Sequence, residues 1–333
     1  MELMDRHPAH WLPARLFWGE EAEAQVTWLH GEDEQFSESF LQDTFNVWMR
    51  RPINAAFAPV TSLERLRARA ASLPGIAPTG FIFHVSRCGS TLLSRLLAQA
   101  PDTLVLSEPP PFDAIVRANH RARRMTEALQ IDTLRAMASA LGQPRTPGQN
   151  RLFIKLDAWH ALQAPLLRAA FPDTPWVFLY RNPIEVMVSQ LRQRGMHTVP
   201  GVLPPALIGG ADSSAVSPED YCAKVLGAIF AAGLAMHTPG RSLLINYSDL
   251  PNAMNPIARH FGLDPNDPNF QTALARELKT DAKRGGDFTP DSVAKRAEAT
   301  PAIHAATMAW LTAIYDQLED ARGVREASSR VLK

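Results

Sequence analysis

The sequence has few cysteines and no excess of charge of either sign. Its 333 residues include two cysteines, Cys88 and Cys222, and 34 basic residues stand against 34 acidic ones. Two thiols far apart in sequence are typical of a reduced intracellular protein, so we expect both to be free. The balanced charge argues against a general nucleic-acid coat, although a local anion site needs only a few cations.

Long apolar runs and metal-ligand spacings are missing as well. The N-terminus carries Glu2, Asp5 and Arg6 and has no apolar core of the kind found in signal peptides. No stretch of about 18 apolar residues, the length needed to span a bilayer, occurs in the chain. We therefore expect a cytoplasmic protein without a spanning segment, without bound nucleic acid and without a metal. The sequence does not indicate an oligomeric state.

Short apolar segments alternate with helical patterns after residue 76. Strands that are apolar throughout and separated by helices predict an α/β fold with a doubly wound parallel sheet flanked by helices. Hydrophobic residues make up 46% of the chain, which is enough for a sizeable core. The predicted strands are 81–85, 103–106, 152–156, 176–180 and 242–245, and the predicted helices 91–100, 113–141 (mostly helical), the stretch up to about 170, and 183–194.

Two segments lie outside this alternation. Residues 1–75 are rich in aromatic side chains and predict an N-terminal helical extension packed on the α/β domain of residues 76–333. Phe40, Leu41, Phe45 and Trp48 fit one helical face, and Ser62 is a candidate cap for a helix over 62–72. Residues 195–218 contain four prolines and four glycines and predict a lid or substrate loop, with simple disorder as the alternative.

The segment FHVSRCGSTLL predicts a phosphate-binding loop between a strand and a helix. Gly89 permits a sharp turn, and the backbone amides of Gly89, Ser90, Thr91 and Leu92 then point at one spot at a helix N-terminus. Arg87, next to Cys88, adds a cation. The alternative is an ordinary strand-to-helix turn with a serine cap.

This loop differs from the common triphosphate loop G-x-x-x-x-G-K-[ST]. Ser90 stands where that pattern has its lysine, and the first glycine is missing. The strand over 176–180 is followed by Arg181 and not by a metal-binding acid. ATP with Mg²⁺ is therefore disfavoured as the ligand.

A second basic segment, VFLYRNPIEVMVSQL, repeats the arrangement. Arg181 follows a predicted strand, Pro183 suits the first helical position, and Ser189 lies two turns into the helix. Because ligands bind at the carboxyl ends of strands in open α/β sheets, Arg181 and Ser189 are candidates for gripping a second phosphate. A surface arginine and a solvated serine are the alternative.

Both segments resemble the family of sulfotransferases that use 3′-phosphoadenylyl sulfate (PAPS). Its first loop, which holds the 5′-phosphosulfate, reads like RSGTTLL, and its second motif, which holds the 3′-phosphate, reads like RNPxDxxxS. Here the residues are RCGSTLL from Arg87 and RNPIE from Arg181, with Ser189 in register. The arginine form of the loop is closer to the bacterial and protein-tyrosine branches. The resemblance implies a P-loop-type fold, PAPS as co-substrate, adenosine 3′,5′-bisphosphate as product, and no metal.

The resemblance also implies site residues. Arg87 would act as a catalytic cation, Glu108 after the second strand as the base, and Lys155 at the end of the third strand as a contact to the leaving oxygen. Tyr247 would lie against the nucleotide. Asp157 is the second candidate for the base, and His160 is a weaker one.

The roles of the other basic residues stay open at this point. Lys283, Arg284 or Lys295 could close over the 3′-phosphate, or belong to a solvated loop. Four arginines predict an exposed helix face or, alternatively, a site that recognises an acidic acceptor. They are Arg117, Arg121, Arg123 and Arg124. The acceptor itself, a small molecule, lipid, sugar or peptide with a hydroxyl or amine, is not specified. A P-loop small-molecule kinase and an inactive nucleotide-binding homologue are the alternative functions.

Overall fold

The computed structural model describes most of the chain. The described residues are 4, 6–18, 23–36, 38–100, 102–121, 125–208, 210, 217–250, 252–277 and 292–323. Lys283, Arg284, Arg123 and Arg124 lie outside them, so the predictions for these four residues stay untested.

A five-stranded sheet forms the centre of the fold, in the order β5-β6-β4-β7-β8. Its strands are β4 (Pro78–His84), β5 (Thr103–Ser107), β6 (Arg151–Lys155), β7 (Trp176–Tyr180) and β8 (Ser242–Asn246). The pairs β5–β6 and β7–β8 are parallel. Every residue of β7 is buried, as expected for a parallel strand covered on both faces. The predicted α/β class with a parallel sheet flanked by helices is confirmed.

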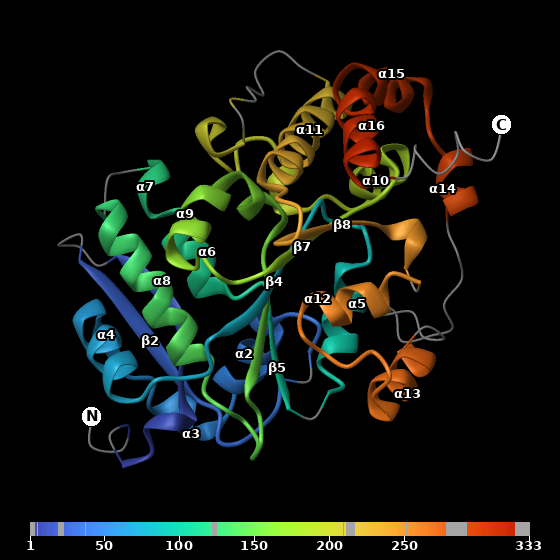
Figure 1. Ribbon diagram of the computed structural model, residues 1–333. Helices are drawn as coiled ribbons and strands as arrows, with labels where there is room; N and C mark the ends of the chain where they lie inside the picture. The colour runs from blue at the N-terminus through green and yellow to red at the C-terminus, as the bar shows by residue number, and fades with distance from the viewer. Residues whose placement is uncertain are drawn as a thin grey trace. The chain divides into compact units, whose positions relative to one another are not determined.

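Helices alternate with these strands along the chain (Figure 1). They are α5 (Ser90–Leu97), α6 (Pro110–Val116), α7 (Ala118–Arg121), α8 (Glu127–Leu141), α9 (Ala164–Ala170), α10 (Pro183–Arg192), α11 (Pro218–Met236), α12 (Met254–His260), α13 (Pro268–Glu277), α14 (Ser292–Ala297), α15 (Pro301–Trp310) and α16 (Thr312–Ala321).

The helical stretch predicted over 113–141 is interrupted. The side chain of Asn119 accepts a hydrogen bond from Met125 N at 2.9 Å and donates one to Met125 O at 2.7 Å. An asparagine that binds nearby backbone groups competes with the helical hydrogen bonds. The predicted helical stretch is thus divided into α6, α7 and α8, and Thr126 caps α8 by accepting a hydrogen bond from Leu129 N.

The chain divides into two compact units that interleave in sequence. The first comprises residues 1–81, 93–156 and 165–174, and the second residues 82–92, 157–164 and 175–333. The predicted division into residues 1–75 and 76–333 stays a prediction.

The N-terminal extension, in the first unit, is only partly helical, so the prediction of a helical extension is wrong for its first half. The strands β1 (Trp11–Trp18), β2 (Ala24–His30) and β3 (Val60–Ser62) form an antiparallel sheet. In β2, Val26 and Trp28 are fully buried on alternate positions, the two-residue period of a strand. Pro13 and an irregular register between Pro13 and Arg15 obscure the same period in β1.

The second half of the extension matches the prediction. Leu41, Phe45 and Trp48 are buried on one face of α2 (Leu41–Met49). Phe40, predicted to share this face, precedes the helix at its N-cap position and is partly exposed, so the prediction is wrong for this residue. The helices α3 (Pro52–Ala56) and α4 (Leu63–Ser72) follow, and Ser62 caps α4 by accepting a hydrogen bond from Arg65 N. In the same unit, α4 packs on α8, and β1 packs on α6 and α8.

In the second unit, α11 packs on α15, α16 and α10, and α14 packs on α10. The predicted lid belongs to this unit and contains two short 3-10 turns, Met196–Thr198 and Pro205–Leu207. His197 and Thr198 are buried, and Gln190 accepts a hydrogen bond from Gly195 N at 2.8 Å. Residues 209 and 211–216 of this loop lie outside the described residues, and its role as a lid stays a prediction.

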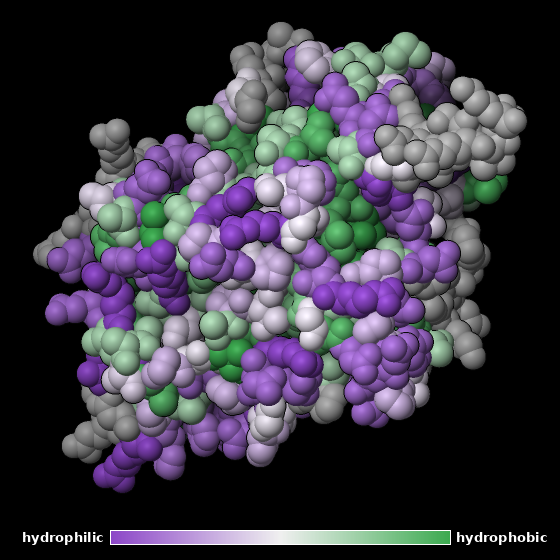
Figure 2. Space-filling view, in the orientation of Figure 1, coloured by the Kyte–Doolittle hydropathy of each residue, from purple (hydrophilic) through white to green (hydrophobic). Residues whose placement is uncertain are grey.

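No helix in the described part of the chain combines the length and apolarity needed to cross a bilayer. On the face drawn in Figure 2, hydrophilic and hydrophobic residues are interspersed.

The antiparallel sheet offers a test of the N-terminal fold. Trp28 Nε1 donates to Thr61 Oγ1 at 2.8 Å, and both residues are buried. Thr61→Val leaves the indole N–H without this acceptor and should lower the free energy of unfolding by about 1–3 kcal/mol. Chemical denaturation measures the change. Val60→Thr, at an exposed neighbouring position, is the control and should change stability by at most about 0.5 kcal/mol. Equal stability of the two variants would contradict the role of this hydrogen bond.

Candidate active site

The loop between β4 and α5 has a strained backbone. Ser86 and Arg87 lie in the left-handed region with φ of 67° and 55°, and Gly89 follows with φ of 84°. For residues other than glycine, this conformation costs on the order of 1–3 kcal/mol each and is found most often at functional sites. Such strain persists only where the surroundings hold the backbone in place.

Strand β7 supplies much of that support. The carbonyl oxygen of Leu179 accepts hydrogen bonds from Val85 N at 3.0 Å and from Cys88 Sγ at 3.3 Å. The imidazole of His84 accepts one from Ser86 N at 2.9 Å. The thiol of Cys88 thus ties the loop to the neighbouring strand, while the predicted role of Cys88 in binding the cofactor stays a prediction.

Gly89 lies against Tyr247, which begins the 3-10 turn after β8. A Cβ atom on Gly89 would come within 2.8 Å of Tyr247 Cδ2 and 3.2 Å of Leu250 Cδ1. Together with its positive φ, this contact explains why glycine occupies the position. Ser90 and Thr91, which follow it, are buried at the start of α5.

The structure brings the two predicted basic segments together. Arg87 Nε donates to Ser189 Oγ at 2.8 Å, so the serine predicted to act with Arg181 contacts the cation of the first loop. Its role at a second phosphate stays a prediction. Ser189 is only 4% exposed. It lies on α10, whose N-terminus is capped by Asn182 through the N–H groups of Ile184 and Glu185.

Arg181 is held by an aromatic ring and a carboxylate. Its guanidinium carbon lies 4.1 Å from the centroid of the Tyr247 ring, and its Nε donates to Glu185 Oε2 at 2.6 Å. Both charged residues are almost fully buried. A buried arginine needs such partners, since removing an unpaired charge from water is very unfavourable.

Glu185 connects this arginine to α14. It accepts hydrogen bonds from Ser292 Oγ at 3.0 Å and from Arg296 Nε at 2.7 Å, and Ser292 also accepts one from Arg181 Nη2 at 3.2 Å. Burial tends to raise the pKa of Glu185, but the hydrogen bond and charge of Arg181, with Arg296 and Ser292, lower it below its ordinary value. The carboxylate therefore stays ionised in this site.

Sequence reasoning missed the roles of Glu185, Ser292 and Arg296. The spacing of four residues between Arg181 and Glu185 was a usable signal, because it brings side chains together at the start of a helix. No local pattern links either residue to α14, more than 100 positions later. Lys295, one of three candidates for contact with a 3′-phosphate, is buried in α14.

In the first unit, Glu108 and Lys155 form a close ion pair. Lys155 Nζ lies 2.6 Å from Glu108 Oε1, and the backbone N–H of Glu108 donates to Lys155 O at 2.7 Å. Glu108 has a left-handed backbone, with φ of 49°. The lysine side chain is 1% exposed and the glutamate 23%, so the carboxylate is the accessible member of the pair.

An aromatic residue from the N-terminal extension contacts the lysine of this pair. Lys155 Nζ lies 4.6 Å from the centroid of the Phe40 ring, a cation–π distance. Phe40 precedes α2 and is partly exposed. Nothing in the local sequence pointed to this contact, because a phenylalanine before an amphipathic helix is usually part of the core.

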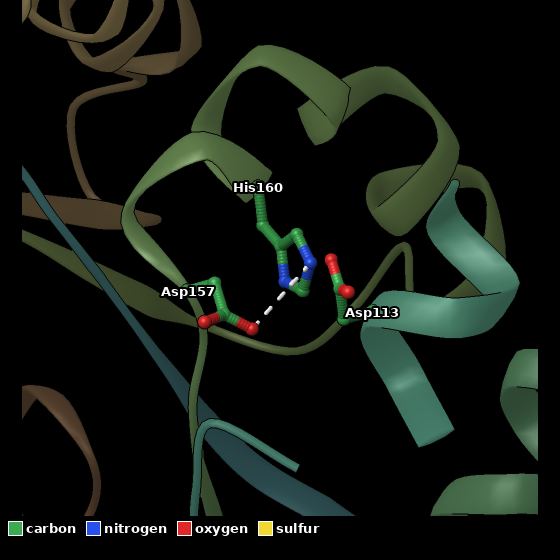
Figure 3. A group of neighbouring side chains, drawn as sticks. All are labelled: Asp113, Asp157 and His160. Carbon is green, nitrogen blue, oxygen red and sulfur yellow. Dashed lines mark ion pairs between the residues drawn. The ribbon is translucent and has the colours of Figure 1, made fainter. Parts of the chain in front are cut away.

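The second candidate for the base belongs to a different pair. Asp157 Oδ2 lies 3.7 Å from Nε2 of the buried His160 (Figure 3). Asp157 begins a 3-10 turn, Ala158–Gln163, which packs on α11 in the second unit. The Asp157 carboxylate thus already faces an imidazole.

Arg117, one of the four arginines predicted to form an exposed basic face, pairs with Asp113 at 2.5 Å and is half-buried. This arginine is therefore not part of an open basic face.

Comparisons with solved structures find sulfotransferases of low sequence identity. The sulfotransferase domain from the curacin biosynthetic pathway is 18% identical, with a TM-score of 0.41 over 71% of this chain and 97% of that chain. A sulfotransferase from Alicyclobacillus acidocaldarius is 16% identical (TM-score 0.44, 74% and 96%). Mouse sulfotransferase SULT7A1, complexed with PAP, is 14% identical (TM-score 0.43, 81% and 96%).

A search of curated proteins finds no match. The model of the sulfotransferase family, in contrast, matches residues 78–264, which is more than half of the chain and contains the strained loop, the Glu108–Lys155 pair, Arg181, Ser189 and Tyr247. On the strength of this match, the chain belongs to the sulfotransferase family.

Proposed function

We propose that this sulfotransferase moves the sulfuryl group from PAPS to a hydroxyl or amine of an acceptor. The observation that carries the proposal is that Gly89 and Arg181 both contact the ring of Tyr247. The loop predicted to hold the 5′-phosphosulfate and the arginine predicted to hold the 3′-phosphate are thus joined through one tyrosine. A nucleotide with phosphates at both ends suits two such anchors.

The residues of the loop would bind and neutralise the donor. Ser90, Thr91 and Leu92 begin a helix, whose N-terminal amides favour an anion. Arg87, oriented by Ser189, would stabilise the charge that develops on the transferred group. Arg181 would bind the 3′-phosphate while Glu185 fixes its position.

Glu108 and Lys155 would carry out the proton and charge transfers. In the proposed step, the acceptor oxygen or nitrogen forms a bond to sulfur while the bond from sulfur to the 5′-phosphate oxygen breaks. Glu108 takes the acceptor's proton, and Lys155 stabilises the negative charge on the leaving oxygen. The products are the sulfated acceptor and adenosine 3′,5′-bisphosphate. Positioning and charge stabilisation are the main requirements for such a loose transition state, by analogy with phosphoryl transfer.

Donor binding can be tested without knowing the acceptor. At one hundred times its Kd, adenosine 3′,5′-bisphosphate should stabilise the protein by about 2.7 kcal/mol and raise its Tm by roughly 4 °C. Arg181→Ala should remove this shift, because it removes the cation that binds the 3′-phosphate. Differential scanning fluorimetry measures it.

The matched control is Arg192→Ala, which removes a half-exposed arginine at the end of α10, the helix that follows Arg181. This variant should keep the full shift. Stabilisation of the wild-type protein by ATP with Mg²⁺, and none by the bisphosphate, would reject the proposal in favour of a kinase.

The base can be identified by comparing two carboxylates. Glu108→Gln should lower kcat about 10²–10⁴-fold, since a general base contributes on that order, while the affinity for the bisphosphate stays unchanged. Asp157→Asn and the exposed control Glu127→Gln should retain activity. The assay measures transfer of labelled sulfate from PAPS into an extract of the native host, followed by mass spectrometry of the product. An active Glu108→Gln together with an inactive Asp157→Asn would assign the base to Asp157. Transfer by none of the proteins, despite bisphosphate binding, would indicate an inactive homologue.

A further inference from the structure

A hydrogen-bonded cluster on α16 supports the strand ends that precede Arg181 and Tyr247. Glu319 Oε1 accepts a hydrogen bond from Tyr180 Oη at 2.6 Å and one from Asn246 Nδ2 at 2.9 Å. Asn246 Nδ2 also lies 2.9 Å from Tyr315 Oη, one helical turn before Glu319. A single carboxylate thus contacts two strands of the sheet. Residue 319 lies well beyond residues 78–264, which match the family model.

The two strand residues occupy matching positions. Tyr180 is the last residue of β7 and Asn246 the last of β8, and they are paired in the parallel register. The residue after Tyr180 is Arg181, and the residue after Asn246 is Tyr247. The side chains of these two following residues stack at 4.1 Å. Fixing the two strand ends against each other therefore also fixes the stacked arginine and tyrosine.

A second connection reaches the turn that carries Tyr247. Arg322 Nη2 donates to Glu319 Oε2 at 2.7 Å, and the same guanidinium pairs with Asp249, the last residue of the 3-10 turn Tyr247–Asp249. Asn246 Oδ1 caps this turn by accepting a hydrogen bond from Ser248 N at 3.1 Å. Both oxygens of Glu319 are thus engaged, one with the strand ends and one with the cation that binds the turn.

The burial of the cluster makes these contacts strong. Tyr180 is fully buried, and burial together with the hydrogen bond to Glu319 raises the pKa of its phenol. The side chains of Glu319 and Arg322 are 16% and 15% exposed. Charge-assisted hydrogen bonds that are shielded from water are stronger and more directional than exposed ones.

We infer that Glu319 is a positioning residue for the 3′-phosphate half of the donor site. It would act through Tyr180 and Asn246 on Arg181 and Tyr247 without touching the nucleotide. The inference rests on the proposed function, because it assigns Arg181 to the 3′-phosphate. It makes α16 a requirement for donor recognition, although this helix lies outside the segment that carries the family motifs.

The test compares two nucleotides that differ in the 3′-phosphate. Isothermal titration calorimetry gives the Kd of adenosine 3′,5′-bisphosphate and of adenosine 5′-monophosphate. Glu319→Ala should weaken binding of the bisphosphate by about tenfold, the effect of loosening one charge-assisted hydrogen bond. Its Kd for the monophosphate should change by less than about twofold, because this ligand makes no contact with Arg181. General unfolding would weaken both ligands equally.

Conservative and control variants sharpen the result. Glu319→Gln keeps an oxygen that can accept from Tyr180 and Asn246, so it should restore most of the preference for the bisphosphate. Asp320→Asn, the neighbouring exposed acid, should bind both nucleotides as the wild type does. If Glu319→Ala fails to fold, Tyr180→Phe removes one donor to Glu319 and keeps the ring, and it should show the same loss of preference in weaker form.

Two outcomes would overturn the inference. A folded Glu319→Ala that keeps the wild-type preference for the bisphosphate would reject the role of Glu319 and leave the proposed function intact. A wild-type protein that does not prefer the bisphosphate over the monophosphate would reject the assignment of Arg181, and with it the basis of this inference.

Discussion

The buried guanidinium of Arg181 is the constraint on which the second unit depends. Its charge is almost completely removed from water, so ring, carboxylate and hydroxyl partners must hold it in place. Tyr247 covers one face and also contacts Gly89 of the strained loop. Glu185 accepts a hydrogen bond from the Nε edge of the guanidinium and another from Arg296 of α14, and so connects Arg181 to that helix. A cation held in this way keeps its geometry when no anion is bound.

The first unit also contains a buried cation that needs partners, Lys155. Lys155 ends a buried strand, and its ammonium is satisfied by Glu108 and covered by Phe40. The left-handed backbone of Glu108 turns the chain directly after β5, where an extended residue would continue the strand direction. Both sites therefore combine a buried cation, a carboxylate and an aromatic ring at the carboxyl end of a strand.

The sequence was sufficient for the sheet and for the two basic segments, because both depend on local patterns. Apolar runs marked the five parallel strands, and glycine, proline and arginine at strand ends marked the loops. The same local reasoning failed for β1, where a proline and a register irregularity hide the alternation. It also failed for Ser292, Arg296 and Phe40, whose partners lie far away in the chain. Their contacts follow from tertiary packing, which no short window of sequence encodes.

The contact between Phe40 and Lys155 has a consequence for how the chain can vary. The matched family segment begins at residue 78, so the ring that covers the lysine comes from a part of the chain that the shared motifs do not contain. Relatives that share the motifs but carry different N-terminal segments would surround the same lysine with other side chains. Exchange of the N-terminal segment would then change the side chains that cover Lys155, while the Glu108–Lys155 pair remains as it is.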